Sequence, residues 1–380
     1  MIRLTVPSID EADFKAVREV LESGFLVQGS KVAAFEQAVA DCVETQHAVA
    51  VSSGTSALHL ALLALGVGPA DIVVTTAYSH PATANVVELC GARPIFVDIE
   101  RDTYNMDPDC LESTLKRLMA EASTARRVKV LLPVHAFGQL AKMPAILAIA
   151  SKYQLPVVED AACALGAKLH GRQAGSWGVM ACFSFHPRKA ITTGEGGIIA
   201  TNDASLARRL RALRNHGQDA DAPAGAFIMP GYNYRMTELQ GALGLTQMVK
   251  LERIVAVRRR LAAVYDRLLA NTPIAPPVVA ADSEPTYQSY VPLLAGDLAQ
   301  RRDELIRESR AQGIETTIGT WHIPLTPYYR TKYAFHRGLL PGADAVFDRT
   351  ISLPLHEQLS TADQQAVVST LTDQLARPAP

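Results

Sequence analysis

Between about residue 48 and residue 200, the chain alternates short β-branched runs with segments of helical pattern. IVVTT precedes PATANVVELC, for example, and VKVLLPV precedes PAILAIASKY. Several of the β-branched runs are apolar throughout, which is typical of strands that helices cover on both faces. The alternation therefore predicts an α/β fold built on a mainly parallel sheet.

The pattern changes after residue 235, where a long helical stretch runs from Thr237 to Leu269. A Pro- and Ala-rich stretch at 271–285 follows it and indicates a hinge region. Beyond the hinge, strand-like runs, a helix near Leu298 to Gln312 and a terminal helix after Ser360 indicate a small α+β unit.

These features predict two domains. The first is a large α/β domain at 1–245, and the second is a small C-terminal α+β domain at 246–380, joined to it by the long helix. The large domain should open with a peripheral helix, because Ser8 to Glu11 has the pattern of a capping box. Phe14, Val17 and Leu21 then follow at helical spacing.

Composition excludes several classes of protein. Lys+Arg 37 against Asp+Glu 38 gives a net charge of −1, so no global basic field exists for nucleic acid or an anionic membrane. The five cysteines are scattered without metal-ligand spacing and are expected to be reduced thiols with no metal site. The most apolar stretch, Ala57 to Gly68, is far shorter than the roughly 18 residues of a membrane span. We expect a soluble cytoplasmic protein.

Three predicted strands end in residues that can carry chemistry, and ligands of open α/β sheets bind at these carboxyl ends. Ser53, Gly54 and Thr55 follow AVAV at the start of a helix, where they could surround a phosphate or act as ordinary N-caps. Asp160 ends LPVVED; it could cap a helix, pair with a base or keep a heterocyclic nitrogen protonated. Lys189 follows MACFSF and is either a solvated side chain or a nucleophile.

Taken together, the three strand ends indicate a site for pyridoxal 5′-phosphate (PLP). This cofactor needs a lysine for its aldehyde, an acid at its ring nitrogen and a group of donors for its phosphate. The lysine, the acid and the helix start described above supply one of each.

The chain also resembles the DegT/DnrJ/StrS family of sugar aminotransferases, which are PLP enzymes of fold type I. The resemblance is carried by ordered motifs along nearly the whole chain: VxxFE, SSGTSALHLALLALGVGP, FVDIERDTYNMDP, LPVHAFGQ, VVEDAACALGA, FSFHPRKAITTGEGG, LRNHG and GYNYRMTELQGALG. It implies a seven-stranded, mainly parallel sheet flanked by helices, a small C-terminal domain, and a cofactor that alternates between PLP and its amine form, PMP.

The resemblance also implies roles for single residues. Lys189 would bind the cofactor aldehyde covalently, and Asp160 would face the ring nitrogen. The phosphate would be held by four residues: Ser53, Gly54, Thr55 and Ser184. Asn233, in GYNYRM, would reach the phosphate of a neighbouring subunit, with Arg235 nearby, so that a homodimer shares its active sites. The same segment could instead be a tight turn before a helix.

Two positions depart from the family pattern. His80 stands where an aromatic residue commonly stacks on the cofactor ring; it could stack as an imidazole or be a hydrogen-bonded loop residue. Cys163 stands where many members have Gln near the phenolic oxygen of the cofactor, and a thiol is a weak donor. Cys163 as a persulfide-forming nucleophile is an alternative that its apolar surroundings disfavour.

Substrate contacts are expected from residues near the lysine and from the small domain. His186 and Glu195 flank Lys189, and Arg235 and His322 are further candidates, although each of these residues could simply hold a loop or pack in the core. The resemblance implies transfer of an amino group from L-glutamate to the keto group of a nucleotide-linked deoxysugar. A keto-cyclitol or another secondary-metabolite ketone is the alternative acceptor. A non-catalytic PLP-binding regulator is the alternative from another class, but such a protein would be expected to lack the lysine or to carry a DNA-binding domain.

Overall fold

A seven-stranded sheet forms the centre of the chain in a computed structural model that describes residues 1–219, 222–223 and 225–376. Two hydrogen-bonded groups of strands meet through bridges from Leu131 to Val157 and from Val134 to Asp160. Only β10 runs antiparallel to its neighbours, so the predicted mainly parallel sheet is confirmed. The strand order is β1 (His47–Val51), β10 (Gly197–Thr201), β9 (Met180–Ser184), β6 (Val158–Asp160), β5 (Val128–Leu132), β2 (Ile72–Thr76) and β4 (Arg93–Val97).

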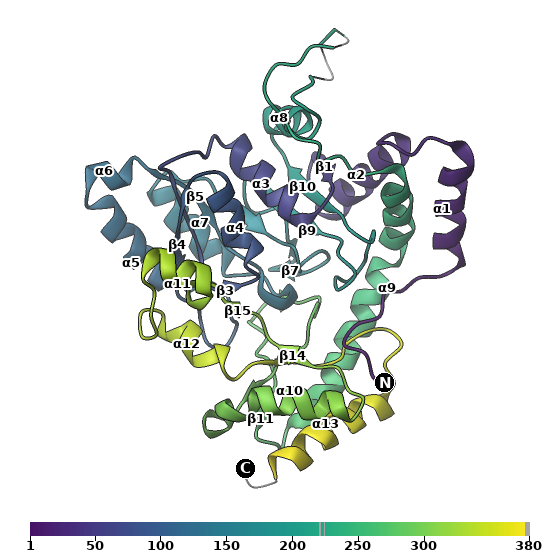
Figure 1. The fold of residues 1–380 in the computed structure, drawn as a ribbon, viewed down its shortest axis with the longest axis vertical. Helices are drawn as coiled ribbons and strands as arrows, with labels where there is room; N and C mark the ends of the chain where they lie inside the picture. Colours follow the sequence, from purple (N-terminus) through teal and green to yellow (C-terminus); the bar gives the residue numbers. More distant parts are fainter. Residues whose placement is uncertain (220–221, 224, 377–380) are drawn as a thin grey trace.

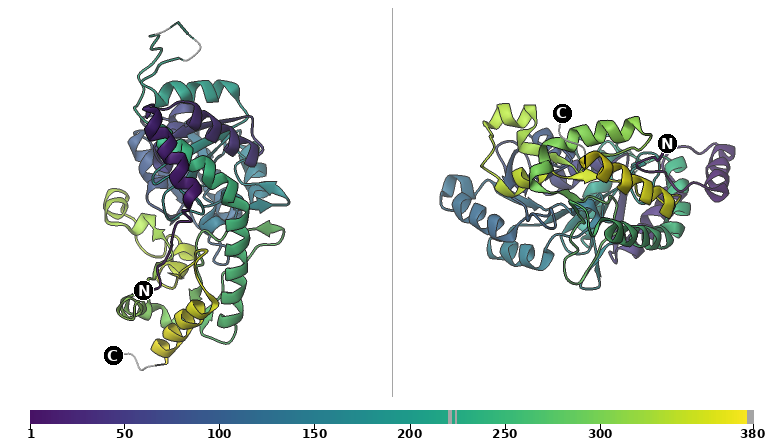
Figure 2. Two further views of the ribbon diagram at one scale, coloured as in Figure 1. Left: turned by 90° about the vertical axis from the view of Figure 1, so that its right-hand side faces the viewer. Right: turned by 90° about the horizontal axis from the view of Figure 1, so that it is seen from below.

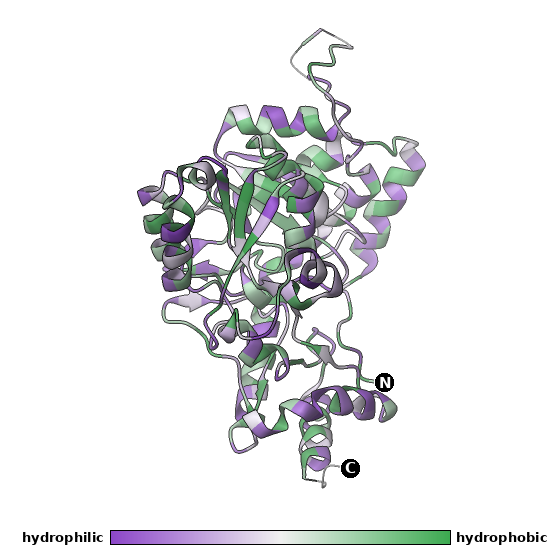
Figure 3. Ribbon diagram, turned by 60° about the vertical axis from the view of Figure 1, so that its left-hand side comes forward, coloured by the Kyte–Doolittle hydropathy of each residue, from purple (hydrophilic) through white to green (hydrophobic). Residues whose placement is uncertain are grey.

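Both faces of this sheet are buried. Val73 and Val130 lie in one apolar cluster, whereas the adjacent Val74 and Leu131 lie in another, as the alternation of side chains along a strand requires. Figure 3 shows mainly hydrophobic strands at the centre, surrounded by helices that carry both hydrophilic and hydrophobic residues. The helices of this part of the chain are α2 (Ser30–Cys42), α3 (Gly54–Ala64), α4 (Ala82–Leu89), α5 (Pro108–Met119), α6 (Ala122–Ala125), α7 (Met143–Lys152) and α8 (Ala204–Arg214), with the 3-10 turn η1 (Ala136–Gly138).

The long helix α9 (Glu238–Leu269) leads from the body of the sheet to the C-terminal part (Figure 1). Its N-cap Thr237 accepts a hydrogen bond from the N–H of Gln240, and the Gln240 side chain accepts one from the N–H of Thr237. The helix predicted from Thr237 to Leu269 is therefore confirmed.

The C-terminal part has a core of its own around α9. Tyr265 stacks on Tyr290, and both pack with Leu305 and Leu371. The helices expected near Leu298 to Gln312 and after Ser360 are both present. The elements of this part are β11 (Ile274–Ala275), β13 (Leu293–Leu294), η2 (Gly296–Arg301), α10 (Arg302–Ala311), β14 (Thr317–Ile318), η3 (Ile323–Leu325), α11 (Pro327–Tyr333), α12 (Pro341–Phe347), β16 (Ile351–Ser352) and α13 (Thr361–Leu375).

Small sheets join the two parts of the chain. One pairs β3 (Tyr78–Ser79) with β15 (Trp321–His322), and another pairs β7 (Lys168–Leu169) with β8 (Arg172–Gln173) and β12 (Ser283–Glu284). The first residues of the chain also lie against the C-terminal part, because Ile2 pairs with Ile314 and Leu4 accepts a hydrogen bond from the N–H of Leu355 (Figure 2). The proposed boundary between 1–245 and 246–380 falls inside α9, and residues 377–380 lie outside the described part.

The first helix, α1 (Glu11–Ser23), differs from its predicted start. Its N-cap is Asp10, which exchanges hydrogen bonds with Asp13, so the expected capping box from Ser8 to Glu11 is wrong. The buried side of α1 carries Asp13, whose carboxylate accepts hydrogen bonds from Thr246, Gln247 and Lys250 of α9. These polar contacts hold α1 against α9, and Phe14 and Leu21 are more than half exposed.

No helix among residues 1–219, 222–223 and 225–376 combines the length and apolarity that crossing a membrane requires. Within the same residues, no three His, Cys, Asp or Glu side chains are grouped so that they could hold a metal ion.

Candidate active site

A solvent-open cleft of about 650 Å³ lies at the carboxyl ends of the parallel strands. Segments that follow β1, β6 and β9 line one side of it, and residues 317–321 with Ser352, Leu353 and Leu355 of the C-terminal part line another. The structure brings ten of the predicted site residues to this cleft: Ser53, Gly54, Thr55, His80, Asp160, Cys163, Ser184, His186, Lys189 and Glu195.

Lys189 lies in a tight loop after β9. Its backbone N–H donates to the carbonyl of His186 at 2.8 Å, and the Thr192 hydroxyl donates to the carbonyl of Phe185, which closes the loop. The Nζ of Lys189 is partly buried and lies 3.1 Å from the Sγ of Cys163. The loop therefore presents the amine inside the cleft, beside a thiol.

Asp160 ends β6 and is buried. Its Oδ2 accepts a hydrogen bond of 2.7 Å from the hydroxyl of Thr83 on α4, and its Oδ1 accepts one of 3.2 Å from the N–H of Ala162. An ionised carboxylate offers about four acceptor sites, so capacity remains for a ring N–H. Thr83 was not predicted; its only signal in the sequence is a hydroxyl at the start of the helix after IVVTT.

The neighbouring Glu159 anchors the same strand end from the other face. Its carboxylate accepts hydrogen bonds from the N–H groups of Gly175, Trp177 and Gly178 at 2.7–2.9 Å. His135 Nε2 lies 2.9 Å from Glu159 Oε2, and both side chains are fully buried. The backbone N–H of His135 donates to the carbonyl of Asp160. Sequence analysis missed this network, which fixes the backbone that carries Asp160.

The start of α3 is suited to hold an anion. The Ser53 hydroxyl accepts a hydrogen bond from the N–H of Ser56 at 3.0 Å and caps the helix, while the first N–H groups of a helix have no acceptor within it. A Cβ on Gly54 would lie only 2.7 Å from the Cβ of Ser184, so this position needs glycine. The tight approach places the Ser184 hydroxyl beside the positive end of the helix dipole.

Two histidines at the cleft are held as neutral loop residues. His80 Nδ1 accepts a hydrogen bond from the N–H of Ala82, and His186 Nδ1 accepts one from the N–H of Arg188. Desolvation and the positive charge of Lys189 lower the pKa of both imidazoles, although Glu195, 4.0 Å from His186, acts in the opposite direction on His186. Both rings are therefore mainly uncharged near pH 7.

Three predicted residues do not line the cleft. Arg235 donates to Asn215 Oδ1 at 2.6 Å, and Asn233 pairs with the backbone of the same Asn215. His322 is buried, with its Nε2 3.3 Å from Asp344 Oδ1, whereas its neighbour Trp321 lines the cleft. Consecutive residues of a strand point to opposite faces, which explains why Trp321 takes the place expected for His322.

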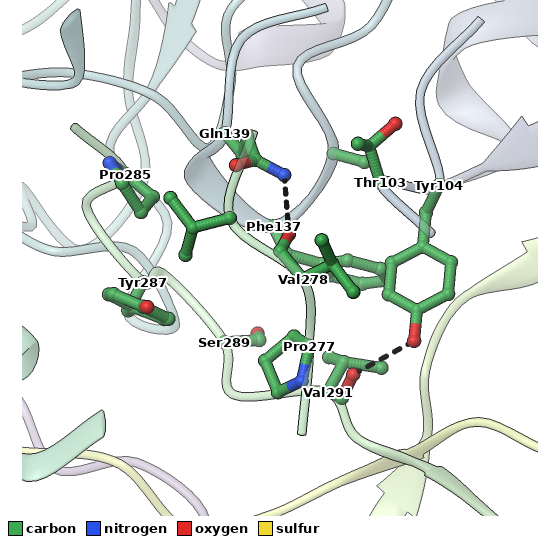
Figure 4. A pocket seen from close by; sticks show the side chains of 12 residues that line it. Thr103, Tyr104, Phe137, Gln139, Pro277, Val278, Pro285, Tyr287, Ser289 and Val291 are labelled. Carbon is green, nitrogen blue, oxygen red and sulfur yellow. Dashed lines mark hydrogen bonds between the residues drawn. The ribbon is translucent and has the colours of Figure 1, made fainter. Parts of the chain in front are cut away.

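A second, much smaller pocket of about 30 Å³ adjoins the cleft and shares Ala136, Phe137 and Ser289 with it (Figure 4). Tyr104 donates to the carbonyl of Val291, and Gln139 donates to the carbonyl of Val278, so the walls join the sheet domain to the segment after α9. Burial raises the pKa of the tyrosines in this pocket. We interpret this pocket as a gap in the packing where the two parts of the chain are in contact.

The fold and the cleft define the class of protein. A lysine amine, a buried carboxylate and a helix N-terminus lie together at the carboxyl ends of the strands, as in PLP enzymes of fold type I. The chain is a PLP-dependent aminotransferase. More particularly, it belongs to the DegT/DnrJ/EryC1/StrS aminotransferase family, whose model matches residues 7–372.

Solved structures agree with this assignment. DesV of S. venezuelae, solved in complex with a ketimine intermediate, is 34% identical with a TM-score of 0.87, and the match covers 97% of this chain and 95% of DesV. PseC of Helicobacter pylori, an aminotransferase in pseudoaminic acid biosynthesis, is 28% identical with a TM-score of 0.90 over 98% of each chain. A Streptococcus pneumoniae protein with known PLP and PMP forms is 28% identical over 98% of each chain, with a TM-score of 0.91 for the PMP form. These comparisons support PLP as the cofactor.

Proposed function

We propose that this aminotransferase moves an amino group from L-glutamate to the keto group of a nucleotide-linked sugar in the cytoplasm. The observation that carries the proposal is the convergence of Lys189, Asp160 and the start of α3 in one cleft. The volume of the cleft exceeds what glutamate needs. Its C-terminal wall carries the hydroxyl groups of Thr317, Thr320 and Ser352, which suit a polyhydroxylated acceptor. The role of PseC in pseudoaminic acid biosynthesis also favours a sugar substrate.

Each group of residues in the cleft has its own proposed role in the reaction. Bound PLP supplies an electron sink for a carbanion at the substrate carbon. Asp160, held by Thr83, keeps the proton on the ring nitrogen of the cofactor, and the helix start at Ser53, Gly54 and Thr55 holds its phosphate. The Nζ of Lys189 would carry the proton from the Cα of the donor to the cofactor in the first half-reaction, and from the cofactor to the acceptor carbon in the second.

The proposal is tested by half-reactions followed through cofactor absorbance. The purified protein with PLP should change spectrum on addition of glutamate, and a panel of keto-sugar nucleotides and keto-cyclitols should then be screened for return of the original spectrum. Lys189→Ala should lose turnover and the absorbance of the lysine-bound cofactor. Asp160→Asn should slow proton transfer far more than it weakens PLP binding. Normal turnover by Lys189→Ala would refute the assignment, and a bound cofactor without any turnover would favour a regulator.

We also propose that the enzyme is a homodimer with shared active sites, to which Asn233 and Arg235 contribute. Exposed apolar side chains flank their segment: Phe25 and Val27 lie on the loop whose Leu26 carbonyl accepts from the N–H of Glu238, and Phe227 is exposed on the preceding loop. Exposed apolar groups of this kind are typical of subunit interfaces.

The shared site has a direct test. If Asn233 acts in the active site of the neighbouring subunit, a mixture of Lys189→Ala and Asn233→Ala protomers forms heterodimers with one intact site, and activity should return to about a quarter of the wild-type value. Two inactive variants that stay inactive after mixing, while light scattering shows dimers, would refute it.

A further inference from the structure

The charges of the cleft are few. Among its lining residues only four carry permanent charge: Asp160, Glu195, Arg188 and Lys189. The two histidines discussed above, His80 and His186, are mainly neutral near pH 7, because desolvation and the neighbouring cations lower their pKa values. Once Lys189 is bonded to the cofactor, Arg188 is the one remaining cation among the described residues that line the cleft.

The backbone of Arg188 is fixed from two sides. Its N–H donates to His186 Nδ1 at 3.2 Å, and its carbonyl accepts a hydrogen bond of 2.9 Å from Gln288 Nε2. Gln288 is in turn held by Arg258, whose guanidinium donates to the Gln288 carbonyl at 3.1 Å. The position of Arg188 is therefore tied both to the lysine loop and to the segment that follows α9.

The guanidinium itself is left without an acidic partner. Some arginines are paired, such as Arg214 with Glu36 and Arg253 with Glu357, whereas no ion pair or side-chain hydrogen bond of Arg188 occurs among residues 1–219, 222–223 and 225–376. The side chain is exposed at the cleft. A fork of guanidinium donors that faces a cleft unpaired is suited to bind a carboxylate or a phosphate in bidentate geometry.

We propose that Arg188 binds the anionic group of a substrate, either a carboxylate of the amino donor or the diphosphate of the sugar nucleotide. This inference rests on the proposed function, since both substrates of that reaction carry such a group. Arg188 then holds this anionic group beside Lys189, and an analogue of that substrate without the anionic group binds more weakly.

The test compares Arg188→Gln and Arg188→Lys with Arg101→Gln, a control at an exposed arginine outside the cleft. Two arms separate the two sources of the anion: the apparent Kd for L-glutamate from single-turnover absorbance changes, and the inhibition constant of UDP. We expect Arg188→Gln to weaken one of them by about 10- to 100-fold, because a bidentate charged contact is lost. Arg188→Lys should recover only part of this loss, and the control should match the wild type.

The outcomes distinguish this inference from the proposed function. Wild-type constants for both glutamate and UDP in Arg188→Gln would overturn the role of Arg188 while leaving the aminotransferase proposal intact. A wild-type enzyme that neither reacts with glutamate nor binds UDP would instead count against the proposed substrates. If Arg188→Gln fails to fold, modification of wild-type holoenzyme by phenylglyoxal answers the same question. Glutamate or UDP should slow modification of Arg188, as read by mass spectrometry, and lack of protection by both would overturn the inference.

Discussion

The hydroxyl of Thr83 donates a 2.7 Å hydrogen bond to the carboxylate of Asp160, although the two residues are 77 positions apart in the chain. Thr83 also lies 3.1 Å from the hydroxyl of Ser79, so a short chain of hydroxyl groups leads from the β3 segment to the carboxylate. All three side chains are buried. The carboxylate proposed to face the cofactor ring is thus oriented by a helix that the lysine and phosphate motifs do not include.

We predict that Thr83→Val slows catalysis. Loss of a hydrogen bond to a charged group costs about 1.5–3 kcal/mol, which corresponds to roughly a 10- to 100-fold lower rate if the whole effect falls on the chemical step. The rate of the half-reaction with glutamate measures it, and Thr83→Ser should keep most of the wild-type rate. Equal rates for the Val and Ser variants would show that this contact does not orient Asp160 for catalysis.

The contact between Lys189 Nζ and Cys163 Sγ predicts selective inactivation by iodoacetamide. Cys163 lines the cleft, whereas Cys90 and Cys182 are buried, and burial raises the pKa of Cys42 and, to about 11, that of Cys110. A higher pKa leaves less of the reactive thiolate. Alkylated Cys163 should block PLP binding, and bound PLP should protect it. Site-resolved mass spectrometry with Cys163→Ser as control measures this; inactivation of the Ser variant at the wild-type rate would contradict it.

The close approach of α3 to β9 predicts that Gly54→Ala is harmful. The new Cβ would lie 2.7 Å from the Cβ of Ser184, and such overpacking costs about 1–3 kcal/mol of stability. The displaced helix start should also bind PLP at least about tenfold more weakly. Denaturant unfolding and PLP titration measure the two effects, with Gly68→Ala as a control because open space surrounds Gly68.

A second substitution tests the cause. Ser184→Gly in the Gly54→Ala background removes the colliding side chain and should restore most of the lost free energy of unfolding. It should not restore PLP affinity in full, because it also removes a hydroxyl proposed to contact the phosphate. A double variant as unstable as Gly54→Ala alone would refute the steric explanation.

Because His59 is buried, we predict that the protein loses stability in acid. Burial lowers the pKa of its imidazole in the folded state, so below the unfolded value of about 6.5 the unfolded chain binds a proton that the folded chain does not. The free energy of unfolding should therefore decrease as the pH falls through 6.5 and level off below the folded pKa. His59→Gln should flatten this dependence between pH 7.5 and 5.5 in urea unfolding, and His336→Gln at an exposed site is the control. An unchanged slope in His59→Gln would contradict the prediction.

The sequence predicted the parts of the fold whose physics is local. The apolar runs form a sheet buried on both faces, and the helix from Thr237 to Leu269 begins where it was predicted, because periodicity and capping act over a few residues. The helix expected over Phe14 to Leu21 is present as α1, but its capping box is formed by Asp10 and Asp13 and not by Ser8 and Glu11. The contacts of Asp13 with α9, more than 230 positions away, could not be read from the local pattern.

The same division holds for the candidate site. The sequence by itself identified the groups that we propose to react, because Lys189, Asp160 and the turn at Ser53 to Thr55 each follow a recognisable strand. Only the tertiary structure decided what surrounds them: Thr83 on Asp160, Cys163 beside Lys189, and Trp321 in the place expected for His322. Arg188 was visible next to Lys189 in the printed sequence, yet its lack of an acidic partner could not be read there. Residues brought into contact by folding are separated by tens or hundreds of positions in the chain, and no local sequence pattern predicts these contacts.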